Sequence, residues 1–141
     1  MKRIIFTAIL IFAFCFTAYG NSPFDSYGKI SWKNEMARLA NLAIALTRDK
    51  DLKVVLQIRF DGNASKSKAK KRLNKIFLFL TDRKNWQIDK TRISFAISEE
   101  DEQRTVYWVM DSTVQFSYCD NCQIVKGENF EQGIKDLFPK K

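Results

Sequence analysis

The chain has 141 residues with a formal net charge of +8, and it contains no histidine. A chain of this length can form one domain with its own core. The commonest general base is absent, and no glycine-rich phosphate loop, serine-nucleophile motif or spaced pair of carboxylates stands out, so we expect a protein that is not an enzyme and holds no cofactor. The positive charge favours anionic partners but does not predict specific nucleic-acid binding.

Residues 1–20 have the layout of a secretory signal peptide. Two basic residues precede an apolar run from Ile4 to Phe16, and Ala18-Tyr19-Gly20 supplies small residues at the cleavage position. An uncleaved anchor is the alternative, but the run is shorter than the roughly 20 residues that span a bilayer. We therefore expect export to the periplasm or the extracellular space and a single mature domain at 21–141. Without the two basic residues of the signal, the net charge falls from +8 to +6, and no membrane span remains.

The mature chain opens with a short turn-rich stretch, Asn21 to Gly28, which is either a brief edge strand or an ordered lead-in. Ser31 is then a candidate N-cap for an amphipathic helix that ends near Arg48, because apolar residues recur at helical spacing. These residues are Trp32, Met36, Leu39, Ala40, Ala43, Leu46 and Thr47.

The central part of the chain predicts a strand, a helix and a second strand. Apolar residues alternate in Lys53–Phe60, and Val55 makes part of the other face apolar, so this strand is expected to be largely buried. Ser65 or Ser67 can cap the helix, whose apolar positions are Ala69, Leu73, Ile76, Phe77 and Leu80. Arg92–Ile97 supplies the second strand, and the succession favours a right-handed crossover between two parallel strands.

The rest of the chain predicts two further strands and a helix. Ser98–Gln103 is an acidic loop, interpreted as a solvated hairpin tip because it lacks the glycine and alternating oxygen ligands of a calcium loop. Thr105–Met110 is predicted to form a hairpin with Ile93–Ile97, and Thr113–Tyr118 is a candidate short strand. Glu128–Phe138 has the spacing of a terminal helix that lies on the sheet.

These elements predict an α/β fold of the α+β two-layer sandwich type. The mixed sheet follows the order β-α-β-α-β-β, with the helices on one face. A disulfide turn and a C-terminal helix follow at 113–141.

Four segments carry a family resemblance: Phe24-Asp25-Ser26 with the Leu39, Leu42, Ala43, Leu46 helix; Lys53–Leu56 leading to Phe60-Asp61-Gly62; Arg72-Leu73 with Ile76, Phe79 and Leu80; and Ile88–Ile93. Together they resemble the OmpA C-terminal-like domain, the periplasmic module that holds the cell wall in outer-membrane proteins and peptidoglycan-associated lipoproteins. The chain is also similar to a divergent group of secreted acidobacterial-type proteins of unassigned function, through Phe24-Asp25-x-Tyr27-Gly28-x-Ile30 and Ala37-Arg38-Leu39.

The resemblance implies a ligand role for Asp61 and Arg72. In wall-binding members, an Asp after the second strand and an Arg in the second helix grip the amine and carboxylate of diaminopimelate, a chemistry that suits both side chains. The chain departs from the family where Lys68-Ala69 replaces an expected Leu-Ser. For Arg72, the alternative is an ordinary solvated helix residue.

Cys119-Asp120-Asn121-Cys122 is the sharpest local motif. A zinc site would need two further ligands, which a mature chain without histidine or a third cysteine does not supply. A redox pair is expected at the start of a helix, whereas this motif follows an apparent strand. In an exported protein a disulfide that clamps the turn is therefore favoured, with a redox pair as the alternative.

The start of the second helix carries a basic patch, Lys66, Lys68, Lys70, Lys71 and Lys75. Lysines there oppose the helix macrodipole, so a counter-anion would be stabilised, although a solvated helix face is the alternative. We therefore predict a non-catalytic envelope or secreted binding module whose partner is peptidoglycan or another anionic envelope polymer. The alternatives are a thiol-disulfide protein using Cys119 and Cys122, or a basic protein that contacts polyanions.

Overall fold

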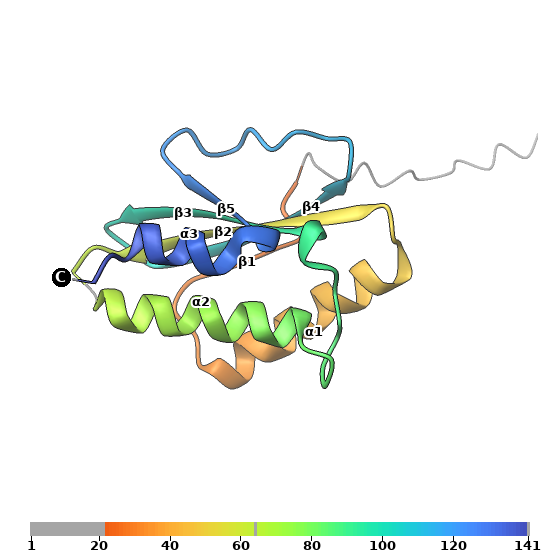
Figure 1. The fold of residues 1–141 in the computed structure, drawn as a ribbon, viewed down its shortest axis with the longest axis horizontal. Helices are drawn as coiled ribbons and strands as arrows, with labels where there is room; N and C mark the ends of the chain where they lie inside the picture. Colours follow the sequence, from red (N-terminus) through yellow and green to blue (C-terminus); the bar gives the residue numbers. More distant parts are fainter. Residues whose placement is uncertain (1–21, 64, 141) are drawn as a thin grey trace, which may run out of the picture.

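The computed structural model describes residues 22–63 and 65–140, so the expected signal peptide at 1–20 lies outside the described residues. The elements are β1 (Asp25–Tyr27), α1 (Trp32–Arg48), β2 (Leu52–Asp61), α2 (Lys66–Thr81), β3 (Ile93–Glu100), β4 (Arg104–Asp111), β5 (Gln123–Lys126) and α3 (Phe130–Leu137). The fold is α+β, with a mixed five-stranded sheet in the order β1-β4-β2-β3-β5 and the helices on one face (Figure 1). In the described ranges, no helix combines the length and the apolar character needed to cross a membrane.

β2 is the centre of the sheet. It pairs in parallel with β3 from Val54↔Ile93 to Asp61↔Glu100, which confirms the predicted parallel pair. Its other edge pairs antiparallel with β4. Every residue from Val54 to Ile58 is buried, as expected for a strand that is covered on both faces.

The predicted hairpin between Ile93–Ile97 and Thr105–Met110 is wrong. β4 lies on the far side of β2, where it pairs with β2 and with the short edge strand β1, and residues 101–103 pass across the end of β2. The outer edge of β3 pairs with β5 instead. Because β2 is apolar on both faces, a strand on each of its edges completes its hydrogen bonding and its burial together, and this outweighs the local preference for a hairpin.

The expected strand at Thr113–Tyr118 is also wrong. This segment belongs to the loop of residues 112–122, which covers the sheet face opposite the helices (Figure 1). Its alternating pattern arises because Phe116 and Tyr118 contact Trp108, and the rings of Tyr118 and Trp108 stack 4.1 Å apart. The next strand is β5, which begins just after the second cysteine and was not predicted.

The helices bury the main core against the inner face of the sheet. Ser31 caps α1 by accepting a hydrogen bond from the backbone N–H of Asn34 at 3.3 Å, as predicted. The predicted terminal helix is confirmed as α3, and its Phe130 ring stacks on Phe77 of α2 at 4.0 Å. The other buried apolar helix residues are Leu39, Leu42, Ala43, Leu46, Leu73, Ile76, Leu80 and Ile134. Each large apolar side chain buried here contributes about 1.5–3 kcal/mol to folding.

Arg92 joins the end of α1 to the start of β2. Its guanidinium donates hydrogen bonds to the backbone carbonyls of Leu46, Asp49 and Leu52 at 2.7, 2.7 and 2.8 Å. A charged donor to otherwise free carbonyls at the C-terminal end of a helix is a favourable arrangement, and here the same guanidinium also binds the first residue of β2. These hydrogen bonds hold the C-terminal end of α1, whereas the candidate site lies at its N-terminal end.

Candidate functional site

A groove of about 730 Å³ opens where the start of α1, the end of β2 and the first half of α2 meet. Asp61 and Arg72, the two residues implied by the family resemblance, both line it, together with Trp32 and Phe60. Four lysines also line it, and we call it the lysine groove: Lys29, Lys68, Lys71 and Lys75.

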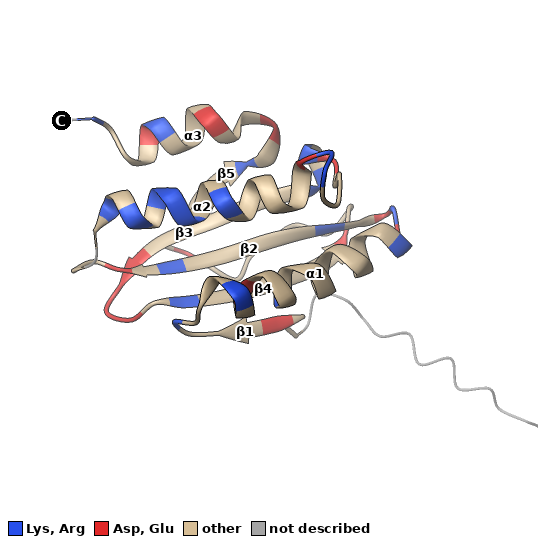
Figure 2. Ribbon diagram, turned by 90° about the horizontal axis from the view of Figure 1, so that it is seen from below, with Lys and Arg blue, Asp and Glu red and all other residues tan. Residues whose placement is uncertain are grey.

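The groove divides the predicted basic patch. Lys68, Lys71 and Lys75 follow each other at helical spacing on one side of α2 and line the groove, whereas Lys66 and Lys70 do not. Figure 2 shows that basic residues recur along α2. The ammonium group of Lys75 lies 5.4 Å from the centre of the Trp32 ring, within range of a cation–π interaction. Lys29, from the connection between β1 and α1, joins the three, and no sequence pattern pointed to it.

Arg72 is held by a carboxylate of the protein itself. Its Nε donates to both carboxylate oxygens of Glu35 on α1, each at 3.1 Å, and its Nη2 donates to Glu35 and, at 2.7 Å, to Oγ1 of Thr105. The side chain of Arg72 is only 19% exposed and that of Glu35 only 4%. The alternative of a solvated Arg72 is therefore wrong.

Two tyrosines complete this cluster, which we call the Glu35 network. The hydroxyl of Tyr27 donates to Glu35 at 2.8 Å and lies 2.5 Å from the hydroxyl of Tyr107. Burial raises the pKa of both phenols well above the ordinary value, so both remain neutral donors and acceptors. Burial alone would lower the pKa of Arg72, but its hydrogen bonds and its charge interaction with Glu35 raise it. The network thus links β1, α1, α2 and β4 around the buried ion pair of Arg72 and Glu35.

Glu35 is the site residue that sequence reasoning missed. A glutamate in the first turn of a helix is usually solvated. However, Glu35 precedes Leu39 by four residues and Leu42 by seven, so it shares the buried face of α1. This spacing was the one sign in the sequence that Glu35 would be buried.

Asp61 stands at the end of β2, and one of its carboxylate oxygens accepts from the backbone N–H of Asn63 at 2.9 Å. This bond closes the turn that leads to α2 and directs the carboxylate to the groove margin. Among the described residues, the ion pairs are Arg38–Asp25 and Arg72–Glu35. The structure therefore brings both predicted ligand residues to one groove, where Arg72 is already paired and Asp61 is not.

Cys119 and Cys122 form a disulfide with their Cα atoms 5.6 Å apart, as predicted. The pair lies in the loop between β4 and β5, and Cys122 contacts the small cluster of Val55, Ala96 and Met110 on the outer face of the sheet. A strand rather than a helix follows it. The helix N-terminus that lowers the pKa of a catalytic thiol is thus not positioned beside this pair.

The acidic run is not a hairpin tip. Glu99 and Glu100 end β3, and Asp101 and Glu102 lie in the crossing to β4. Within residues 22–63 and 65–140, no three His, Cys, Asp or Glu side chains come together in a way that could hold a metal ion.

No protein-family model, curated protein or solved structure matches the chain. The resemblance to the OmpA C-terminal-like domain therefore stays a prediction that rests on the residue patterns. The fold and the site define an α+β protein in which a buried Glu–Arg network supports a lysine-lined groove.

Proposed function

We propose that the protein is a non-catalytic binding module, exported to the envelope or secreted, whose lysine groove takes negatively charged groups of an envelope polymer. Peptidoglycan is the candidate we favour. The observation that carries the proposal is the convergence of four lysines around one groove of about 730 Å³ that also has aromatic walls. A bound carboxylate or phosphate would offset the mutual repulsion of these lysines.

The start of α2 adds to the attraction for an anion. The first turn of α2 contains no acidic residue, and the side chain of its N-cap, Ser65, makes no capping hydrogen bond. The first backbone N–H groups of a helix have no intrahelical partner, and the helix dipole makes this end positive. Lys68 therefore lies beside backbone donors that an anionic group can also use.

Asp61 gives the groove a second kind of contact. Its carboxylate lines the same groove as the lysines, so it can accept hydrogen bonds from an ammonium group. Wall peptides carry both carboxylates and amines, and a groove with both charge signs suits them better than it suits a uniform polyanion. Arg72 also lines this groove and is held in place by its hydrogen bonds to Glu35.

Co-sedimentation with purified cell wall tests the proposal. The double variant Lys68→Gln/Lys71→Gln removes two groove charges, and Lys66→Gln/Lys70→Gln removes two charges from the same helix outside the groove. We expect the first to weaken binding about tenfold and the second to change it little. If the wild type stays in the supernatant, wall binding is wrong. If the two double variants lose binding equally, the contact is a diffuse attraction to polyanions.

Asp61→Asn supplies a test whose sign separates two ligand chemistries. If the ligand presents an ammonium group to Asp61, the variant binds the wall less well than the wild type. If the ligand is purely anionic, loss of the carboxylate makes the groove more positive, and binding becomes tighter. Tighter binding by Asp61→Asn would therefore contradict a mixed-charge ligand such as a wall peptide.

A further inference from the structure

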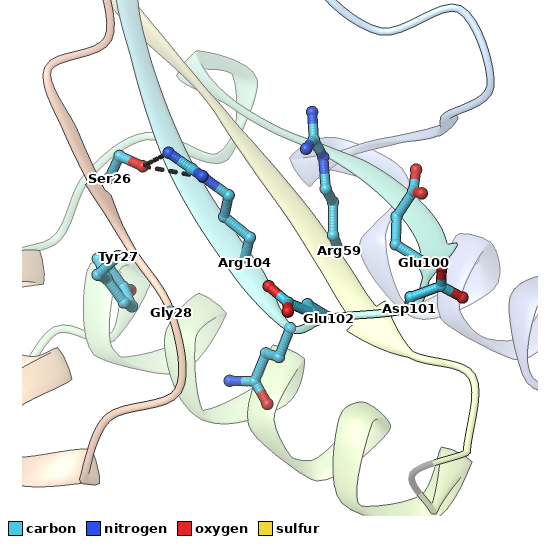
Figure 3. Close-up of a pocket in the computed structure, with 9 residues that line it drawn as sticks. Ser26, Tyr27, Gly28, Arg59, Glu100, Asp101, Glu102 and Arg104 are labelled. Carbon is cyan, nitrogen blue, oxygen red and sulfur yellow. Dashed lines mark hydrogen bonds between the residues drawn. The ribbon is translucent and has the colours of Figure 1, made fainter.

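A second pocket, of about 440 Å³, lies between the turn after β1 and the crossing from β3 to β4. Two arginines line it, Arg59 on β2 and Arg104 on β4, and they stand directly opposite each other in the antiparallel register. Figure 3 shows the two side chains extending side by side from neighbouring strands. Like charges directly opposite across two strands destabilise a sheet. An anionic group between the two guanidinium groups would offset this repulsion.

Within residues 22–63 and 65–140, no carboxylate forms an ion pair with either of these arginines. Arg104 donates to the hydroxyl of Ser26 at 3.1 and 3.3 Å. Over the described part of the chain, neither arginine has a carboxylate within 4.0 Å, since the ion pairs there are Arg38–Asp25 and Arg72–Glu35. Two guanidinium groups therefore face the pocket with most of their donors free for a ligand or for water.

Three carboxylates line the same pocket from the crossing segment: Glu100, Asp101 and Glu102. They share the pocket with Arg59 and Arg104 but do not contact them within ion-pair distance. A simple anion would relieve the arginine repulsion but would meet three negative charges, and a simple cation would meet two positive ones. Only a ligand that carries both charges is complementary to the whole lining.

We propose that this charged pocket binds a small zwitterion of the amino acid class. Its carboxylate lies between Arg59 and Arg104, where guanidinium groups can bind it in bidentate fashion, and the Ser26 hydroxyl is a further donor. Its ammonium group lies against Glu100, Asp101 and Glu102. Gln103 lines both this pocket and the lysine groove, but none of the charged residues of one lines the other, and the proposal does not depend on wall binding.

Nuclear magnetic resonance of the purified protein tests this with β-alanine and its two single-charge halves, propanoate and propylammonium, at matched ionic strength. We expect β-alanine to shift the Nε–Hε signals of Arg59 and Arg104 and the amide signals of 100–104, with saturation at millimolar concentrations, on the order of 1–10 mM. Each half should bind several-fold more weakly. Equal binding by propanoate would reduce the pocket to an anion site and overturn the proposal, as would no shift with any of the three.

Variants test which pocket residues bind the carboxylate and which bind the ammonium group of the ligand. Arg59→Gln and Asp101→Asn should each weaken β-alanine binding about tenfold, while Arg83→Gln and Glu131→Gln, exposed residues of the same charge types outside the pocket, should leave it unchanged. Without ligand, Arg59→Gln should raise the midpoint of thermal unfolding, because it removes the cross-strand repulsion. A lower midpoint would mean that Arg59 is held by the protein itself, and this would contradict the proposal.

Discussion

Replacing Arg72 by methionine should destabilise the protein more than any other loss of a single charge on α2. After the substitution, the Tyr27 hydroxyl is the one hydrogen-bond donor that the described residues still offer to Glu35, whose side chain is 4% exposed. Breaking a buried ion pair by removing one partner costs about 3–5 kcal/mol, and the depth of Glu35 places this case near 4 kcal/mol. Glu35→Met should cost less, about 2 kcal/mol, because Arg72 is 19% exposed and can turn toward the groove.

Equilibrium denaturation of the two single variants and of Glu35→Met/Arg72→Met forms a double-mutant cycle. The double variant replaces both charges by apolar chains of similar length, so its free energy of unfolding should lie within about 1 kcal/mol of the wild type. The coupling free energy, which is the difference between the summed single costs and the cost of the double variant, should then be about 5 kcal/mol or more. Lys70→Met, on the same helix but outside the groove, is the control and should change stability by less than about 0.5 kcal/mol.

Two results would refute this reasoning. If the costs of Arg72→Met and Glu35→Met simply add in the double variant, the two charges do not interact strongly. If Arg72→Met costs less than about 1 kcal/mol, Glu35 reaches water and behaves as an exposed ion pair. In either case the buried network would not be what positions α1 and α2 around the groove.

Three further predictions concern a buried tyrosine, the disulfide and a close-packed glycine. Burial raises the pKa of Tyr107, so above a pH of about 10 the unfolded chain loses this proton before the folded protein does, and the free energy of unfolding falls. Tyr107→Phe should make the fall in the free energy of unfolding with rising pH shallower by up to about 1.4 kcal/mol per pH unit. Replacing Cys119 and Cys122 by serine should lower the free energy of unfolding by about 2 kcal/mol or less in denaturant titrations, because the closed loop is short. Gly127→Ala should cost about 2–4 kcal/mol in the same assay, since its Cβ would lie 2.3 Å from the backbone oxygen of Lys90.

Each of these has a contradicting outcome. An unchanged alkaline slope in Tyr107→Phe would mean that this phenol ionises in the folded state as it does in the unfolded chain. Complete unfolding of the serine double variant would show that the disulfide holds the sheet rather than the loop of residues 112–122. A stable Gly127→Ala variant would mean that the 3-10 turn Gly127–Asn129 can move away from Lys90.

Hydrophobic periodicity was sufficient to predict the elements but not all of their neighbours. α1, β2, α2 and β3 were predicted because each carries its own pattern, and the crossover rule then made β2 and β3 parallel. The position of β4 could not be predicted, because its largely buried residues suit either edge of the β2–β3 pair and the short crossing at 101–103 reaches both edges. β5 could not be predicted because, of its four residues, only Val125 is buried, which leaves no periodicity to detect.

The candidate site was predictable only in outline, and the missing residue changes how the groove must be tested. The turn after β2 and the phase of α2 were enough to place Asp61 and Arg72 near each other, but not to show that Arg72 is paired. A guanidinium paired with Glu35 is an expensive group to remove, so loss of binding in Arg72→Ala would report unfolding as readily as a lost ligand contact. The exposed Lys68 and Lys71 and the margin residue Asp61 can change without breaking the core. Their variants, rather than those of Arg72, therefore separate a binding role from a structural one.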